Sequence, residues 1–505
     1  MLSKVKSFGL SGLEGFMVTV EVDVSASLPA CEIVGLPDAA VRESKERVRS
    51  AIKNSGFDYP VGRITVNLAP ADMKKEGSIY DLPIALGIIS ATGQLKGPMP
   101  DYIYLGELAL DGSIRGIHGL LPMVISASAQ GYDTFVVPSA NAPETSYISS
   151  VTAYGAASLK EAVDIINSGG RAVPWEKKQW SPKRISYHND FEDIKGQYGA
   201  KRAAEIAAAG GHNMLLVGTP GSGKTMLAKS MPSILPELTF NEALEITKIQ
   251  SITGIMEAGE GIASERPFRS PHHSASTAAL VGGGQKAMPG EISLAHYGVL
   301  FLDEFPEFVL ESLRQPLEDG VVTITRASAK ATYPADFMLI AAMNPCPCGY
   351  YGSRMQECRC KPYEIAKYRN RISGPLLDRL DMHVEMAEVG YSDITSNKPG
   401  ESSAAIRERV DEARRIQRER YKKDGIICNA QLSARLVKKY CVPDENGQRL
   451  MRQAYERLNL SARAYNRVMK VARTIADLSG GGDITYEHIA EAIQYRTVDK
   501  KYWGE

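Results

Sequence analysis

The residues with the clearest chemical potential are the eight that read Gly-Thr-Pro-Gly-Ser-Gly-Lys-Thr and end at Thr225. Such glycines let backbone N–H groups curl around phosphate oxygens, and the first turn of a following helix favours negative charge. Lys224 is expected to reach the β- and γ-phosphates, and Thr225 to bind Mg²⁺. An apolar run over 214–217 predicts a strand before the loop, which argues against a chance Gly-rich turn. The expected nucleotide-binding residues are Gly218, Thr219, Pro220, Gly221, Ser222, Gly223, Lys224 and Thr225.

Two acidic residues follow a second apolar run. Residues 298–305 read Gly-Val-Leu-Phe-Leu-Asp-Glu-Phe, which predicts a buried parallel strand ending at Asp303 and Glu304. Ligands of open α/β sheets bind at the carboxyl ends of the strands. Asp303 is expected to coordinate Mg²⁺, and Glu304 to act as general base on the attacking water. Alone this pattern is common, but together with the phosphate loop it indicates ATP hydrolysis.

Two further predicted strands each carry a polar residue at one end. "FMLIAAMN" ends in Asn344, whose amide could position the lytic water against the γ-phosphate; the alternative is an amide that caps the strand end. Arg379 precedes the strand predicted in "DMHVEM". It could stabilise the γ-phosphate charge in a neighbouring subunit. From spacing alone, a salt bridge with Asp378 or Asp381 is an equally good reading.

Four of the seven cysteines lie within 15 residues, as two Cys-x-Cys pairs. In a reducing compartment, clustered cysteines indicate metal ligands more than disulfides. Four thiolates complete a tetrahedral zinc site and leave no position for water, so we expect a structural metal. The alternative is four free cysteines in a loop. The expected Zn²⁺ ligands are Cys346, Cys348, Cys358 and Cys360.

Four segments must position these residues. Residues 1–168 alternate β-rich and helical stretches, which predicts an N-terminal α+β domain. A polar, Pro- and Gly-containing linker is expected over 169–189. Strand and helix signals alternate over 190–395, which predicts an α/β core that also holds the cysteine loop 346–360. Residues 396–505 read as helices. The fold class is therefore a multidomain α/β protein.

Composition excludes several classes of protein. The 44% hydrophobic and 23% charged content is ordinary for a globular protein, and no apolar run approaches the ~20 residues that span a bilayer. The start lacks a signal peptide, so we expect a cytoplasmic protein with no membrane partner. Formal net charge is zero, which excludes nucleic-acid binding by global charge. Any contact with DNA must come from a local patch.

Taken together, these segments resemble an AAA+ ATPase of the magnesium-chelatase-like clade, and more closely the YifB/ComM family. The resemblance covers nearly the whole chain. It rests on "EGSIYDLPIALGII", "GTPGSGKT", "RPFRSPHHSAS", "PGEISLAHYGVLFLDEF", "NPCPCGYYG", "RISGPLLDRLD" and "ARAYNRVMKVARTIADL". The resemblance implies an AAA+ α/β P-loop core with a C-terminal helical lid, assembled as a hexameric ring with ATP and Mg²⁺ between subunits.

The family pattern also implies roles for individual residues. Gly218 to Thr225 resemble Walker A, and Asp303 with Glu304 resemble Walker B. Asn344 is similar to sensor 1 and Arg379 to the arginine finger. The resemblance further implies that Ile194, in "DFEDIKGQ", packs on adenine and that Arg463 contacts bound nucleotide as sensor 2; the alternative for Arg463 is a surface helix residue.

The N-terminal region resembles the Lon-protease-like, S5-type domain. Active members carry a nucleophilic serine after Gly-Pro, whereas this chain reads Gly77-Ser78-Ile79 and places Ile79 at that position. A Ser/Lys protease also needs a base within hydrogen-bond reach of its serine, and the sequence offers no convincing partner lysine. We therefore expect a non-proteolytic binding or assembly module.

The resemblance implies a DNA motor that drives branch migration during homologous recombination and natural transformation. Its expected partners are branched or single-stranded DNA and, as a functional neighbour, a recombinase. Alternatives are a magnesium-chelatase-like remodeller of a protein and an ATP-dependent protease. Two insertions could contact DNA phosphates in a pore, or could be solvated surface. The first carries Arg266, Arg269, His272, His273 and Lys286, and the second reads as a β-hairpin with Arg326 and Lys330.

Overall fold

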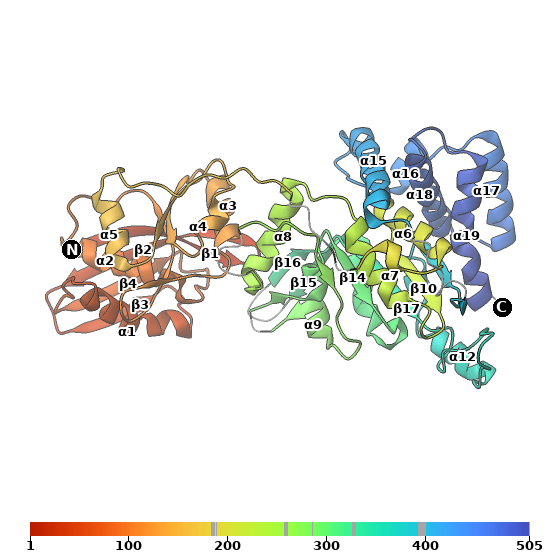
Figure 1. Cartoon of the computed structure of the whole chain (residues 1–505). Helices are drawn as coiled ribbons and strands as arrows, with labels where there is room; N and C mark the ends of the chain where they lie inside the picture. Colours follow the sequence, from red (N-terminus) through yellow and green to blue (C-terminus); the bar gives the residue numbers. More distant parts are fainter. Residues whose placement is uncertain are drawn as a thin grey trace.

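A computed structural model describes residues 1–182, 187, 189–256, 261–284, 286–325, 330–391 and 400–503. The molecule is elongated (Figure 1): the N-terminal region lies at one end, the P-loop core in the middle, and the C-terminal helices at the other end. Among the described helices, none combines the length and the apolar composition that crossing a bilayer requires. Arg326 and the expected boundary at 395/396 lie outside the described residues.

The N-terminal region is built on a mixed seven-stranded sheet in the order β3-β4-β2-β1-β5-β8-β9. Strands β1 and β2 form a long antiparallel pair joined by a tight turn, with Lys6 opposite Thr19. Val18, Val20 and Val22 alternate along β2 and are fully buried, because successive side chains point to opposite faces of a strand. The α+β pattern expected from the sequence is confirmed.

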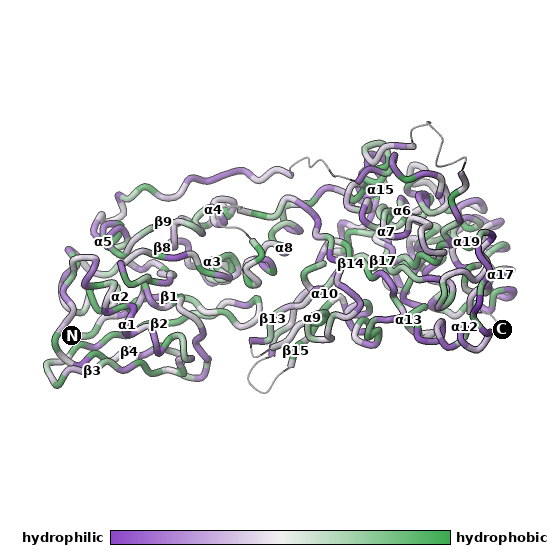
Figure 2. The backbone as a smooth tube through the Cα atoms, turned by 60° about the horizontal axis from the view of Figure 1, so that its bottom comes forward, coloured by the Kyte–Doolittle hydropathy of each residue, from purple (hydrophilic) through white to green (hydrophobic). Residues whose placement is uncertain are grey.

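The elements of this region are β1 (Leu2–Ser11), β2 (Glu14–Ser25), β3 (Ala30–Val34), α1 (Ala39–Asn54), β4 (Arg63–Ala69), α2 (Asp81–Ala91), β5 (Ile103–Tyr104), β6 (Glu107–Leu108), β7 (Ile114–Arg115), α3 (Leu120–Ala129), β8 (Thr134–Pro138), α4 (Ala142–Thr145), β9 (Thr152–Ala156) and α5 (Leu159–Asn167). After α5, the described residues of the connector up to residue 190 have no regular secondary structure, and they are mostly hydrophilic (Figure 2).

The core is a five-stranded sheet in the order β11-β14-β17-β10-β18, and every pair in it is parallel. Its strands are β10 (Met214–Gly218), β11 (Phe268–Arg269), β14 (Val299–Leu302), β17 (Met338–Met343) and β18 (Met382–Met386). All residues of β10, β14 and β17 are buried, as expected for parallel strands covered on both faces. The expected α/β core is confirmed.

The two faces of this sheet pack against different partners. Met214 and Leu216 belong to the hydrophobic cluster that includes α6 and the C-terminal helices, whereas Leu215 and Val217 belong to a cluster shared with the insertions. Helices and hairpins around the sheet are α6 (Tyr198–Gly210), α7 (Lys224–Ser230), α8 (Phe240–Thr253), α9 (Thr277–Val281), β12 (Gly282–Gly283), β13 (Met288–Pro289), α10 (Glu291–Leu294), α11 (Arg314–Asp319), β15 (Val321–Thr325), β16 (Lys330–Pro334), α12 (Pro362–Arg369) and α13 (Gly374–Leu377).

The second insertion folds as expected: β15 and β16 pair antiparallel with Thr323 opposite Thr332. The C-terminal region is helical, with α15 (Ser403–Tyr421), α16 (Ala434–Tyr440), α17 (Glu445–Leu458), α18 (Ala462–Leu478) and α19 (Tyr486–Trp503). Buried residues of α15 and α18, among them Val410 and Ile475, join the same hydrophobic cluster as β10. The helical region is therefore packed onto one face of the core sheet.

Among the described residues, the contacts of the N-terminal region with the core include one with α8 and one with the β15–β16 hairpin. The backbone N–H of Gly119, which precedes α3, donates to Ser251 O of α8 at 2.9 Å. The β1–β2 turn approaches the hairpin, because a Cβ added at Gly12 would lie 3.2 Å from Ala331 Cβ. One contact therefore involves the helix that precedes the first insertion, and the other involves the hairpin of the second insertion.

Candidate active site

The phosphate loop lies between β10 and α7, in the strand–loop–helix order that the sequence predicts. Gly221 and Gly223 have φ values of +80° and +90°, a backbone region that side-chain-bearing residues rarely adopt. A Cβ at Gly218 would lie 2.8 Å from Met386 Cβ and from Ser222 Oγ. The loop geometry therefore depends on glycine at these positions.

Lys224 folds back over this loop. Its Nζ donates to Gly218 O at 2.8 Å, to Thr219 O at 2.9 Å and to Asn344 Oδ1 at 3.2 Å. Burial lowers the pKa of Lys224 to about 8, although the Asp303 carboxylate acts in the opposite direction. The ammonium thus lies between the loop and Asn344 at the end of β17, where phosphate oxygens would give it anionic partners.

Thr225, at the start of α7, and Asp303, just after β14, come together at the carboxyl-end side of the sheet, although β17 separates β14 from β10. Thr225 Oγ1 donates to Asp303 Oδ2 at 2.8 Å. A hydroxyl and a carboxylate are hard oxygen ligands of the kind Mg²⁺ takes together with nucleotide phosphates. These residues fit the metal that the sequence predicts, and both would bind it from the protein side.

Glu304 is in contact with His273, which the sequence offered only as a possible DNA contact or a surface residue. His273 Nδ1 lies 2.8 Å from Glu304 Oε2, and the His272 ring centroid lies 4.1 Å from that of His273. Glu304 also has a positive φ of +53°, and its backbone N–H donates to Asp303 Oδ1. Non-glycine residues in this region are strained and concentrate at functional sites. The spacing of "PHHS" gives no sign that it would reach Glu304.

Arg379 and Arg463 lie together at the other edge of the sheet. Arg379 Nη2 forms an ion pair with Glu318 of α11, and Arg463 Nη2 lies 3.8 Å from Glu318 Oε1. The partner of Arg379 is therefore neither of the aspartates considered from the sequence. A cavity of about 660 Å³ at this edge is lined by all three side chains. Arg463 makes no contact with the phosphate loop of its own chain in this arrangement.

Asp381 fixes the start of β18, two residues after Arg379. Its carboxylate accepts from the backbone N–H of Asn213 at 3.0 Å and pairs with Arg467 of α18. Burial alone would raise the pKa of Asp381, but Arg467 and His212 hold it well below its usual range. The charged carboxylate thereby connects the amino ends of β10 and β18 to the helical region.

Ile194 is buried, with 3% of its surface exposed, in the cluster that contains α6 and β10. Its contact with adenine stays a prediction. A neighbour that the sequence did not single out anchors this segment: Gln197 Nε2 donates to Ser222 O at 2.9 Å and to Ala387 O at 2.6 Å. Gln197 therefore ties the segment before α6 to the phosphate loop.

Neither reading considered for Arg266, contact with DNA phosphates or solvated surface, agrees with its place in the structure. Its guanidinium is buried, pairs with Glu242 at 3.0 Å and donates to backbone carbonyls, so it is a structural residue. Arg269 is likewise engaged, in a two-point ion pair with Glu291. Ion pairing with acidic side chains makes these arginines unavailable for binding phosphate. The sequence alone does not distinguish such paired arginines from unpaired ones. Lys286 and Lys330 are exposed.

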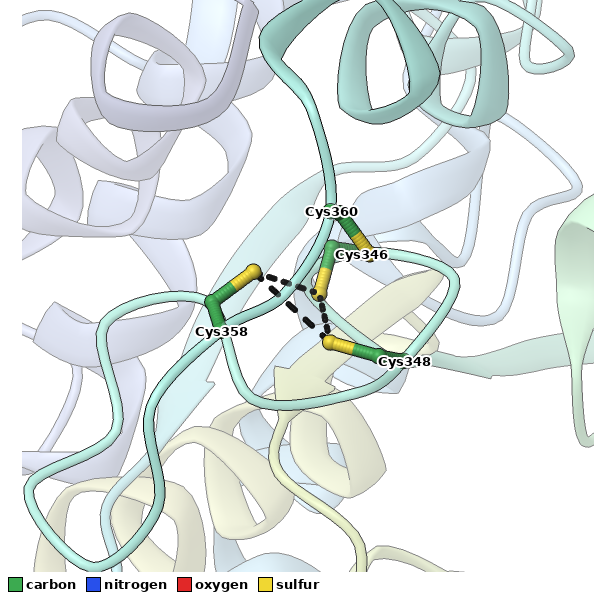
Figure 3. Close-up of side chains that lie close together, drawn as sticks. All are labelled: Cys346, Cys348, Cys358 and Cys360. Atoms are coloured by element: carbon green, nitrogen blue, oxygen red, sulfur yellow. Dashed lines mark hydrogen bonds between the residues drawn. The ribbon is translucent and has the colours of Figure 1, made fainter.

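The four cysteines converge on one point (Figure 3). Their Sγ atoms all lie within 4.8 Å of one another, and Cys346 Sγ lies 3.4 Å from Cys348 Sγ and 3.7 Å from Cys358 Sγ. A tetrahedral zinc with bonds of about 2.3 Å places its sulfurs about 3.8 Å apart, whereas a disulfide needs about 2.05 Å. The arrangement suits a metal rather than disulfides.

In the N-terminal region, Ser78 and the nearest lysine have different partners. Ser78 Oγ donates to the Glu107 carboxylate. Lys75 is buried, and its Nζ donates to the backbone carbonyls of Pro70 and Met73. Ile79 packs against the hydrophobic clusters of the sheet. The serine is therefore not paired with a lysine base.

Comparison with known proteins gives the family. Three family models match: magnesium chelatase, subunit ChlI, over 190–394; subunit ChlI of Mg-chelatase over 20–141; and the ChlI C-terminal model over 400–496. The chain is 44% identical to the competence protein ComM of Haemophilus influenzae, over 98% of both chains. It is 44% identical to the protein YifB of Salmonella typhimurium, over 97% of this chain and 96% of that one. A magnesium-chelatase 67 kDa subunit of Chlorobaculum parvum is 30% identical, over 31% of this chain and 23% of that one. The chain belongs to the ComM/YifB family and carries the magnesium-chelatase-like AAA ATPase domain.

Proposed function

We propose that this protein is a ring-forming, ATP-hydrolysing motor that moves branched DNA, as in branch migration during homologous recombination or natural transformation. The observation that carries the proposal is the separation of Arg379 from the phosphate loop. Arg379 lies at the amino ends of the strands, and the loop lies at their carboxyl ends. The five residues of β10 separate these ends by about 16 Å.

That separation supports a role for Arg379 at a site on another subunit. Arg463 lies beside it, at the same edge of the sheet. We propose that both arginines meet the phosphates of ATP bound to the neighbour, and that release of Arg379 from Glu318 accompanies ring assembly. Closed assembly of such head-to-tail contacts forms a ring, and the family resemblance favours six subunits.

Within one site, each residue has a defined task. Lys224 and the loop from Gly218 bind the phosphates, Thr225 and Asp303 bind Mg²⁺, and Glu304 takes a proton from the attacking water while Asn344 orients it. When bound by Thr225 and Asp303, Mg²⁺ would supply positive charge next to the phosphoryl oxygens. We propose domain boundaries after residues 168, 189 and 395, so that the C-terminal segment forms a helical lid.

The N-terminal domain is proposed to be Lon-like in fold and non-proteolytic. The Ser78–Glu107 pairing supports this, because a carboxylate partner without a lysine does not generate the amine base of a Ser/Lys dyad. Its contacts with α8 and the β15–β16 hairpin suit an assembly or coupling module. Lys330 on the hairpin and Lys286 in the Gly-rich insertion are the proposed DNA contacts among the described residues.

A comparison of ATPase activators tests the proposal. Forked or single-stranded DNA should stimulate hydrolysis several-fold, and the stimulation should weaken as salt is raised because phosphate contacts release counterions. Stimulation by unfolded protein alone would instead favour a remodeller of proteins. No stimulation by any of the three would contradict the DNA motor and leave only an ATPase.

Two variants separate binding from hydrolysis. Lys224→Ala should lose ATP binding and turnover. Glu304→Gln should bind ATP without hydrolysing it and should trap assembled rings, seen by light scattering as six copies of the 55.0 kDa chain. ATP-dependent assembly into dimers only would contradict the ring.

A further inference from the structure

The cysteine cluster is joined directly to the residues that surround the nucleotide. Cys346 follows Asn344 by two positions, and Asn344 Oδ1 accepts from Lys224 Nζ at 3.2 Å. Cys346 is fully buried, so this first sulfur lies inside the core at the end of β17. A change in the position of Cys346 would be transmitted to Asn344 through one intervening proline.

The same loop packs against the phosphate loop. Gly349 N–H donates to Cys346 O at 3.0 Å and closes a tight turn in which Gly349 has a φ of +88°. A Cβ added at Gly349 would lie 2.7 Å from both Cδ and Cγ of Pro220. The backbone of this turn therefore rests on the proline ring of the phosphate loop, with no space for a side chain between them.

Arg369 of α12, which follows the loop, reaches back to the residue that precedes the loop's first cysteine. Its guanidinium donates to Pro345 O at 3.0 Å and to Tyr502 O at 3.0 Å. It also lies between two aromatic rings, 4.7 Å from the Tyr351 centroid and 4.8 Å from that of Tyr502. Such cation–π contacts hold both flanks of the loop to α19. Between these anchors, the segment that carries Cys348, Cys358 and Cys360 has no regular secondary structure.

We propose that Cys346, Cys348, Cys358 and Cys360 bind one Zn²⁺, and that this metal holds Gly349 against Pro220 and Asn344 against Lys224. Zinc would thereby be a structural component of the ATP site. Four sulfur ligands are a closed, soft set that selects Zn²⁺ over Mg²⁺ and leaves no open position for catalysis by the metal. The proposal rests on the nucleotide site proposed above.

Zinc content and ATP affinity are measured separately to test this. Protein purified without chelator should contain about one zinc per chain. In the Glu304→Gln background, which removes hydrolysis, a fluorescent ATP analogue should bind about tenfold more weakly after zinc is stripped with a strong chelator. Added Zn²⁺ should restore the affinity, and added Mg²⁺ alone should not.

Three variants sharpen the test. The double variant Cys358→Ser/Cys360→Ser should lose both zinc and ATP affinity, whereas Cys31→Ser, in the N-terminal sheet, should lose neither. Gly349→Ala should keep its zinc but bind ATP more weakly, because the added methyl group meets Pro220. This last variant separates contact with the phosphate loop from general unfolding of the cysteine loop.

Either of two results would overturn the proposal. One is less than about 0.2 zinc per chain in gently purified protein, and the other is full ATP affinity after complete loss of zinc. If the zinc-loaded protein binds no ATP at all, the assignment of the nucleotide site under the proposed function is wrong. Lys224→Ala serves as the reference for that case, since it should retain zinc and lose ATP.

Discussion

Replacing His273 with alanine is expected to raise the basal rate of ATP hydrolysis. In the structure, His273 Nδ1 lies 2.8 Å from Glu304 Oε2, so it engages the carboxylate that would accept a proton from water. A general base whose carboxylate oxygen already contacts another group must break that contact before it can accept a proton from water. Removing the imidazole removes this step and leaves the P-loop residues unchanged.

The size of the effect follows from the exposure of the pair. The two side chains are 37% and 54% exposed, and even with a protonated imidazole an exposed ion pair of this kind is worth about 0.2–1 kcal/mol. Since about 1.36 kcal/mol changes a rate tenfold, kcat should rise between about 1.4-fold and about fivefold. KM for ATP should stay the same, because His273 contacts none of the phosphate-loop residues described above.

The assay is steady-state ATP hydrolysis without DNA, over a range of ATP concentrations. His272→Ala is the matched control: its Nδ1 lies 2.7 Å from Ser274 Oγ rather than against Glu304, so its basal rate should match the wild type. A fall of kcat in His273→Ala towards the level of Glu304→Gln would refute the reasoning. That result would mean that the imidazole helps Glu304 act as a base.

Two further predictions concern subunit contacts and pH. Arg379→Ala should lower kcat by about a thousandfold, and mixing it with Lys224→Ala protein should restore part of the activity, because an intact arginine then faces an intact phosphate loop; a mixture as inactive as its components would contradict action between subunits. Burial raises the pKa of Glu144 from its ordinary value of 4.5 to about 6. The protonated side chain therefore contributes its full stability below about pH 4.5, and this contribution is lost as the pH rises through about 6. At pH 7.5 the buried carboxylate costs about 2 kcal/mol. Glu144→Gln should therefore increase resistance to urea at pH 7.5 and not at pH 4.5, and an equal gain at both would contradict this assignment.

The architecture of the core could be predicted because its signals are local. The apolar runs that form β10, β14 and β17 are continuous, so they indicated buried parallel strands, and the alternating Val and Thr residues after Gly320 indicated a hairpin. The basic residues of the first insertion could not be sorted in the same way. Arg266 is neutralised by Glu242, 24 positions earlier, and its burial depends on how the insertion packs.

The sequence by itself predicted which residues would bind phosphate and Mg²⁺ and fixed the order in which they occur, because the phosphate loop and the acidic strand end are short motifs whose chemistry follows from adjacent residues. It also determined the four-cysteine set. Only the tertiary structure decided which of these parts meet: His273 with Glu304, Arg379 with Glu318, and Gly349 with Pro220. The physical reason is that the strand order brings distant loops to the same edge of the sheet, and the conformation of each loop depends on what it packs against. The role proposed for the cysteines therefore depends on the contact between Gly349 of their loop and Pro220, which no spacing of residues could reveal.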